Sequence, residues 1–299
     1  MKHILFIFFL MCSMIFNECH AQYQKWSADY TPLSKYETVD IARLKLTYTF
    51  SHIYDPDLCN LRYRDVHTLL IGDHYSNYFS QQFVDFCVKK EAKQASEALP
   101  PQGTIGLNLY KNYPYQGKMT VVELGGEISF GANLMYEEEM PAIHWQLHND
   151  TTTILFYSCK KATADFRGRH YVAWYAPEIP ISDGPWKLGG LPGMILQAGD
   201  SENDIVFECI GIEKFTSQEV TRLYDGLGGG KPKKELADKD LIKFYDVKYK
   251  KLTRDEFMKT MQLFTSDPSQ YWLDNGLERG VGYKLLPLPF NSMERNFDE

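Results

Sequence analysis

Residues 43–50 read Arg-Leu-Lys-Leu-Thr-Tyr-Thr-Phe, and every second side chain is apolar. The apolar positions are Leu44, Leu46, Tyr48 and Phe50. Successive side chains of a β-strand point to opposite faces of a sheet, so strict alternation is typical of a strand with one buried face. The stretch therefore predicts a half-buried strand.

Similar patterns recur along the chain and predict a protein dominated by strands. We expect further strands near 62–72, 118–124, 142–147, 153–159, 169–176, 194–199 and 204–212. The last two flank Gly199–Asp204, a run rich in turn-forming residues, and therefore predict a β-hairpin.

Two segments show helical spacing instead. In 252–264, Thr253 can cap a helix, and Glu256 three residues later completes a capping box. Residues 76–95 carry phenylalanines at helical spacing and form the second predicted helix. Strands with few helices predict an α+β fold with a mainly antiparallel, curved sheet, shaped as a half-barrel or bowl.

The first 21 residues have the layout of a secretory signal peptide. A positively charged start, Met1–His3, precedes an apolar run from Ile4 to Phe16, and the small residue Ala21 precedes Gln22. A membrane-spanning helix needs about 20 apolar residues, so this run is too short for a permanent anchor. We expect cleavage after Ala21 and a periplasmic or secreted protein whose residues 22–299 form a single domain.

Composition sets further limits. The chain has 39 acidic and 32 basic residues, and this mild negative excess argues against nucleic acid as a partner. Its 44% hydrophobic and 14% aromatic residues are enough for a sizeable core. Residues 225–251 are rich in glycine, lysine and aspartate and predict a flexible excursion from the domain.

The cysteines predict disulfides rather than a metal site. Beyond residue 21 the cysteines are Cys59, Cys87, Cys159 and Cys209. An even number in an oxidising compartment predicts one or two bridges, with three possible pairings. The pairing that closes the shortest loops is Cys59–Cys87 with Cys159–Cys209.

No pattern in the sequence calls for a metal or another cofactor. No cysteine pair has zinc-ligand spacing. His144 and His148 lie in a β-rich context, where four residues span about 13 Å, too far for one metal ion. We therefore expect neither a metal nor a cofactor.

Residues 184–193 hold four glycines and two prolines and lead directly into an apolar triplet. Proline fixes φ near −65° and glycine accepts positive φ, so Leu191-Pro192-Gly193 predicts a type II turn. Adjacent glycines let the backbone pass close to another element. The segment is therefore expected to be a rigid loop, anchored by Trp186 and Leu188, that delivers the chain into a core strand.

This loop resembles the signature of the GLPGLI family, exported bacterial proteins named after that string. Gly190-Leu191-Pro192-Gly193 matches, and Met194 stands where the name has leucine. The neighbouring segments that agree with the family are Cys159–Ala162, Phe166–Arg169, Ala173–Tyr175 and Glu178–Ile181. Asn291–Glu294 matches two of four positions in the family's Asn-Pro-Ile-Glu segment. The resemblance implies an exported protein of unknown function, and it implies no catalytic residues.

Three functions fit these observations. The first is a non-catalytic binding or accessory protein with a concave, aromatic-lined sheet. Its ligand would be apolar, a peptide or a glycan, or its partner an outer-membrane protein complex. The binding residues at its rim would be Gly184, Pro185, Trp186, Gly190, Leu191, Pro192 and Gly193. The second is a hydrolase that uses Asp183 or Glu178 with Arg169 and His170. The third is a scaffold loop that binds nothing. A buried Trp186 favours the scaffold, and an exposed Trp186 beside a pocket favours binding.

Overall fold

The structure is a computed structural model that describes residues 33–53, 62–94, 101, 103–124, 133–215, 241–267 and 292–295. Of these residues, 53% lie in strands and 13% in two helices, so the fold is mostly β and the predicted α+β class was wrong. One reason is the predicted helix 76–95. Its first five residues, Ser76–Ser80, form a strand, and the helix begins only at Gln81.

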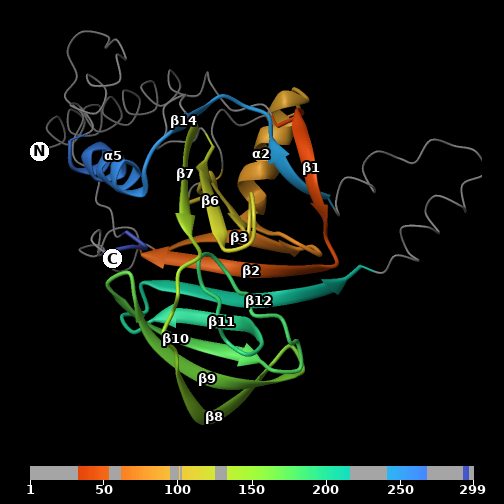
Figure 1. The fold of residues 1–299 in the computed structure, drawn as a ribbon, viewed down its shortest axis with the longest axis vertical. Coiled ribbons are helices and arrows are strands. Elements are labelled where there is room, and N and C mark those ends of the chain that lie inside the picture. Colours follow the sequence, from red (N-terminus) through yellow and green to blue (C-terminus); the bar gives the residue numbers. More distant parts are fainter. Residues whose placement is uncertain are drawn as a thin grey trace, which may run out of the picture.

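Figure 1 shows the arrangement of the elements. The strands before the central turn region are β1 (Tyr36–Ile41), β2 (Leu44–Ile53), β3 (Arg62–Ile71), β4 (Ser76–Ser80), β5 (Leu107–Lys111), β6 (Lys118–Glu123) and β7 (Asn133–Glu139). The later strands are β8 (Gln146–Ile154), β9 (Tyr157–Phe166), β10 (Arg169–Ala176), β11 (Met194–Asp200), β12 (Ile205–Lys214), β13 (Leu241–Tyr245) and β14 (Tyr249–Lys251). The helices are α2 (Gln81–Glu91) and α5 (Arg254–Ser266).

Twelve strands form one mixed sheet in the order β14-β7-β6-β5-β4-β3-β2-β12-β11-β10-β9-β8, and β1 pairs with β13 separately. Among the described strands of the large sheet, only β14 and β7 pair in parallel. Strands β2 to β7 form one meander of sequence neighbours, and β8 to β12 form a second. The two meanders join where β12 pairs with β2, near the middle of the molecule in Figure 1.

The predicted half-barrel or bowl was also wrong, because the large sheet is neither closed nor curled. Its first meander is covered on both faces instead of enclosing a hollow. Neighbouring residues such as Leu69 and Leu70 belong to different core clusters, as do Leu109 and Tyr110. Since neighbouring side chains of a strand point to opposite faces, each face of this meander has its own packed layer.

The alternation in residues 43–50 is confirmed, because Leu44, Leu46, Tyr48 and Phe50 are all buried. The predicted hairpin is confirmed as β11 and β12, which pair antiparallel. The capping box of α5 is confirmed too. The Glu256 amide donates to Thr253 Oγ1 at 3.2 Å, and the Thr253 amide donates to Glu256 Oε2 at 2.7 Å.

Other local predictions were wrong. The strand expected over 153–159 is interrupted at Leu155 and Phe156, whose φ values of +46° and +71° make the turn between β8 and β9. Most of the strand expected over 142–147 is loop, since β8 begins at Gln146. The excursion expected over 225–251 ends in β13 and β14, so it was wrong for residues 241–245 and 249–251. Residues 225–240 lie outside the described chain.

The described part of the chain contains no helix that is both long and apolar enough to span a bilayer. The predicted signal peptide, residues 1–21, lies outside the described residues.

Candidate functional site

The glycine- and proline-rich loop is largely buried and enters β11, as predicted. Trp186 is only 2% exposed, and its ring centroid lies 5.8 Å from that of Phe166 and 6.2 Å from that of Tyr171. Of the seven residues predicted to bind a ligand, only Gly190 and Pro192 are exposed. The burial of Trp186 favours the scaffold reading of this loop.

The turn at Leu191–Gly193 differs from the predicted type II turn. The Gly193 amide donates to the Leu191 carbonyl at 2.8 Å, which closes a tighter turn around Pro192. Gly193 has φ +151°, whereas the third residue of a type II turn has φ near +80°. A Cβ at Gly193 would lie 2.7 Å from the carbonyl carbon of Ala176 and 2.9 Å from Pro177 Cα. The glycine is therefore needed for close backbone contact.

Gly193→Ala is expected to lower the free energy of unfolding by about 2–3 kcal/mol, because it combines a φ value that only glycine adopts readily with a clash against Ala176. Urea denaturation of the purified variant measures this effect. Gly117→Ala is the matched control, since it has φ +88° but no atom within 4 Å of the new Cβ. Equal losses in both variants would show that the contact with Ala176 has no effect on stability.

A buried lysine anchors the start of the loop to the first meander. Lys111 Nζ lies 2.6 Å from Asp183 Oδ1 and donates to the carbonyls of Gly184, at 2.7 Å, and Leu188, at 3.1 Å. Ser76 Oγ donates to the other carboxylate oxygen of Asp183 at 2.6 Å. Both oxygens of Asp183 therefore bond to structural partners.

The other residues of the predicted hydrolase lie apart from Asp183. Glu178 is exposed and accepts a hydrogen bond from the Ser158 amide. His170 is exposed and pairs with Asp165 at 2.7 Å. Arg169 is buried and bonds to Asp200 and to the Ser292 carbonyl. The structure therefore does not bring the four predicted catalytic residues into one site.

Cys87, Cys159 and Cys209 are buried free thiols, so the predicted Cys159–Cys209 bridge is not formed. Cys159 lies on β9 and Cys209 on β12, and two strands separate β9 from β12 in the sheet. The pairing was predicted from the number of residues between the cysteines, which does not indicate how far apart their strands lie in the sheet. Cys59, the predicted partner of Cys87, lies outside the described residues.

Lys187, within the same loop, lies in a buried cluster of charges. Its ammonium group bonds to Tyr136 at 2.8 Å, to Glu294 at 2.5 Å and to Glu138. Burial alone would lower the pKa of Lys187, but Tyr136, Glu294 and Glu138 raise it above its ordinary value. Lys187 therefore stays charged although it is only 3% exposed.

Three further carboxylates lie close enough together to hold a metal ion, namely those of Asp200, Glu202 and Asp204. In this structure they face arginines. Arg169 bonds to Asp200, and Arg295 bonds to Glu202 at 2.6 Å and to Asp204 at 3.3 Å. Their negative charge is thus already balanced by protein groups.

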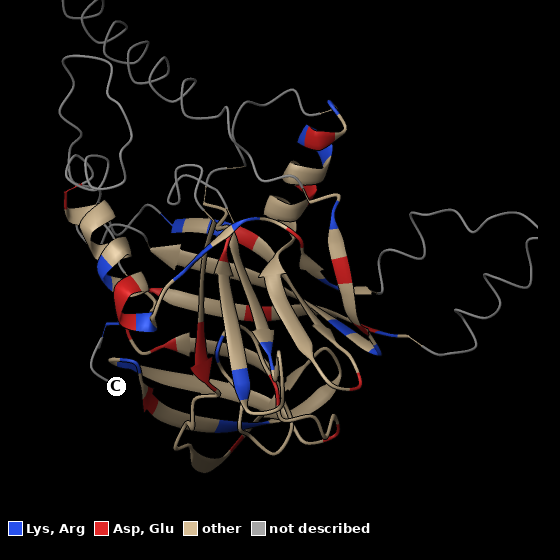
Figure 2. Ribbon diagram, turned by 45° about the horizontal axis from the view of Figure 1, so that its top comes forward, with Lys and Arg blue, Asp and Glu red and all other residues tan. Residues whose placement is uncertain are grey.

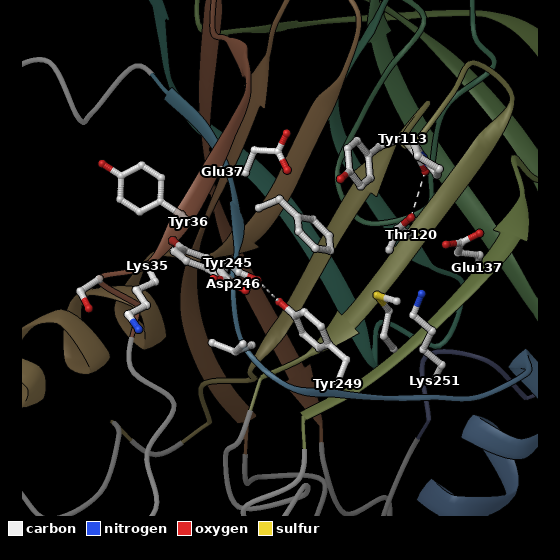
Figure 3. Close-up of a pocket in the computed structure, with 15 residues that line it drawn as sticks. Lys35, Tyr36, Glu37, Tyr113, Thr120, Glu137, Tyr245, Asp246, Tyr249 and Lys251 are labelled. Atoms are coloured by element: carbon white, nitrogen blue, oxygen red, sulfur yellow. Dashed lines mark hydrogen bonds between the residues drawn. The ribbon is translucent and has the colours of Figure 1, made fainter.

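A pocket of about 920 Å³ opens elsewhere, where the β1–β13 pair meets β6, β7 and β14 (Figure 3). Its aromatic lining residues are Tyr36, Tyr113, Phe244, Tyr245 and Tyr249, and all except Tyr245 are half-buried. Its charged lining residues are Lys35, Glu37, Glu137, Asp246 and Lys251, all exposed. The pocket thus combines accessible ring faces with charged groups.

The aromatic wall of this pocket is held by contacts within the wall itself. The rings of Tyr113 and Phe244 stack with centroids 5.1 Å apart, and Phe244 also contacts Tyr249 at 5.8 Å. The Tyr249 hydroxyl donates to the Tyr245 carbonyl at 2.8 Å, and the Thr120 hydroxyl donates to the Tyr113 carbonyl at 3.0 Å. These contacts fix the rings before any ligand arrives.

The field around Tyr113 is negative. Burial raises the pKa of the Tyr113 hydroxyl, and the charges of Glu37 and Glu137 raise it further. Figure 3 shows these two carboxylates on either side of the Tyr113 ring. The pocket therefore offers hydrogen-bond acceptors next to aromatic faces.

The sequence interpretation missed this pocket. Its lining comes from residues 34–37, 113–120, 135–137 and 244–251, which no local pattern connects. The closest signal was the aromatic content of Phe244-Tyr245 and Tyr249, inside a segment interpreted as a solvated excursion.

Comparisons with known proteins give limited matches. Among solved structures, "Structure of PNGF-II in P21 space group" aligns with a TM-score of 0.44 and 13% sequence identity, and covers 73% of this chain and 33% of that chain. The C2 crystal form of PNGF-II aligns with a TM-score of 0.40 and 14% identity, and covers 61% of this chain and 30% of that chain. The chain thus spans about a third of the length of the PNGF-II chains it matches.

No curated protein sequence matches the chain. A family model described as "Protein of unknown function (Porph_ging)" matches residues 166–197, the segment that contains the loop resembling the GLPGLI signature. The GLPGLI name itself is not confirmed by this match. Over this short segment, the chain is similar to an uncharacterised family of Bacteroidetes-type proteins.

Proposed function

We propose that the chain is an exported, non-catalytic binding protein of the GLPGLI type, and that its ligand site is the aromatic pocket formed by β1, β6, β7, β13 and β14. The pocket geometry supports this most directly, because four half-buried aromatic rings surround a volume of about 920 Å³. Ligand pockets of small molecules typically have volumes of about 300–1,000 Å³ and aromatic walls with a few polar groups. The signal-peptide pattern of residues 1–21 supports export.

The chemistry of the pocket favours a glycan fragment over a lipid. Sugar rings have apolar C–H faces that pack on aromatic rings, and they have hydroxyl groups that donate to carboxylates. Tyr113 and Tyr249 supply the faces, and Glu37 and Glu137 supply the acceptors. A lipid chain has no hydroxyl groups along its length, so it would make no hydrogen bonds to these two carboxylates.

Isothermal titration with chitotriose, maltotriose, trilysine and palmitate tests this proposal. At least one of the two neutral trisaccharides is expected to bind, and Tyr113→Ala is expected to weaken that binding about tenfold, since about 1.4 kcal/mol corresponds to a factor of ten. The matched control is Tyr115→Ala, because Tyr115 lies two residues away, is 58% exposed and does not line the pocket. Circular dichroism of both variants verifies that they fold.

Three results would contradict the proposal. One is binding of trilysine or palmitate alone, and another is binding of none of the four probes. The third is saccharide binding that Tyr113→Ala and Tyr115→Ala weaken equally, which would place the ligand outside the pocket.

A further inference from the structure

The described C-terminal segment, Ser292–Arg295, is held by backbone hydrogen bonds next to residues 184–193, the signature loop. Its backbone makes two sets of hydrogen bonds. The Ser292 carbonyl accepts from Arg169 Nε at 3.0 Å and from Arg169 Nη2 at 2.5 Å. The Arg295 amide donates to the Arg167 carbonyl at 2.8 Å. Arg169 at the start of β10 and Arg167 in the β9–β10 turn thus hold the two ends of the segment.

The side chain of Glu294 enters a buried set of cations. It is 5% exposed, and its carboxylate lies 2.5 Å from Lys187 Nζ, 2.7 Å from Arg254 Nη2 and 3.9 Å from Arg167 Nε. The three cations come from the signature loop, from the first turn of α5 and from the β9–β10 turn. Figure 2 shows charged residues of both signs on the side of the molecule where α5 and the C-terminal end lie.

The neighbours of Glu294 make specific contacts as well. Met293 packs against the main hydrophobic core. The Arg295 guanidinium bonds to Glu202 at 2.6 Å and to Asp204 at 3.3 Å. The surrounding residues therefore contact an apolar, an acidic and a basic side chain in succession.

The Glu294 carboxylate offsets part of the positive charge at this position. Lys187, Arg167 and Arg254 each pair with both Glu138 and Glu294. Removal of one partner of a buried ion pair is strongly unfavourable, so loss of the Glu294 carboxylate would cost the buried Lys187 one of its two acidic contacts. Arg167, Arg169 and Lys187 all lie in the segment that matches the family model.

We propose that the residues around the signature loop form a peptide-binding site for an extended peptide with a glutamate flanked by methionine and arginine, and that the chain's own segment Ser292–Arg295 occupies it. This site is separate from the aromatic pocket. The signature loop then has a binding role directed at the C-terminal segment of the same chain, with Lys187 as the residue that recognises the glutamate.

A cleavable form of the full chain tests this assignment. A recognition site for a sequence-specific protease is inserted between residues 267 and 292, and the folded protein is cut. The C-terminal piece is expected to stay bound during gel filtration at low and at moderate salt, because salt screens buried ion pairs much less than exposed ones. Glu294→Gln, introduced before cutting, is expected to release the piece at low salt, whereas the exposed control Glu213→Gln is not.

A second measurement needs only the wild-type chain, in case Glu294→Gln does not fold. After cutting, a fluorescent synthetic peptide with the sequence of residues 291–296 is expected to replace the bound piece. The same peptide with glutamine in place of Glu294 is expected to bind at least tenfold more weakly. Equal binding of the two peptides, or release of the wild-type piece at low salt, would overturn the proposal.

Discussion

Replacement of Lys187 by alanine is expected to lower the free energy of unfolding by about 3–5 kcal/mol, the usual loss when one partner of a buried ion pair is removed. Lys187 lies closer to both Glu138 and Glu294 than Arg167 or Arg254 does, and Tyr136 also bonds to its ammonium group. Without it, the buried carboxylate of Glu294 and the half-buried carboxylate of Glu138 lose their closest positive charge. Urea denaturation followed by far-UV circular dichroism measures the change.

Two further variants separate charge from packing. Lys187→Met keeps most of the side-chain volume, so it is expected to destabilise the protein nearly as much as Lys187→Ala if the charge is responsible. Lys160→Ala removes an exposed lysine from β9 and is expected to change stability by less than about 0.5 kcal/mol. A small loss for Lys187→Met would attribute the effect to packing.

The second large effect concerns pH. Glu123, at the end of β6, is 4% exposed, and burial raises the pKa of its carboxyl to about 8, although a backbone hydrogen bond from Gly106 opposes the rise. Between its ordinary pKa of 4.5 and about 8, the folded chain keeps this proton and the unfolded chain loses it. The free energy of unfolding therefore decreases as the pH rises from about 4.5 to about 8, because the unfolded chain releases this proton and the folded chain does not.

Glu123→Gln removes this dependence, because the amide stays neutral at every pH. The variant is expected to match the wild type near pH 4 and to exceed its stability at pH 8 by up to about 5 kcal/mol, since one pKa unit corresponds to about 1.4 kcal/mol. The difference in unfolding free energy between variant and wild type, measured in urea at several pH values, isolates Glu123 from other titrating groups. A difference that does not change with pH would refute a raised pKa, and Glu139→Gln serves as an exposed control on β7.

Local patterns predicted those elements that are stabilised by contacts between residues close together in the sequence. The capping box needs only Thr253 and Glu256, three positions apart, and the β11–β12 hairpin needs only a turn between two apolar runs. Strand β2 was equally clear, because four successive positions of its buried face, Leu44 to Phe50, are apolar. In these segments the sequence alone determines both the element and its buried face.

The missed elements depend on distant partners. Ser76–Ser80 contains serines and an asparagine, which favour turns or caps. The segment is nevertheless a buried strand, because Asn77 donates to the Leu109 carbonyl at 3.0 Å and Ser76 donates to Asp183. Nothing within five residues of Ser76 indicates these bonds. The fold class was misjudged for the same reason, since several short strands have no clear alternation.

The candidate sites show the same contrast. The signature loop was found from its glycines and prolines, but the ion pair between Lys187 and Glu294 joins residues more than a hundred positions apart. The aromatic pocket draws on four separate segments and has no local motif. Sequence reasoning therefore found the loop that shapes one site and missed the cavity of the other.

The pairing of β2 with β12 has a consequence for how fast the chain folds. Most strand pairs join sequence neighbours, but in this pair Thr49 and Glu208 meet although they are 159 positions apart. Non-local pairing slows folding, because a long loop has to close before the contact forms. We therefore expect each meander to form its hairpins early, and the pairing of β2 with β12 to form later and make the sheet continuous.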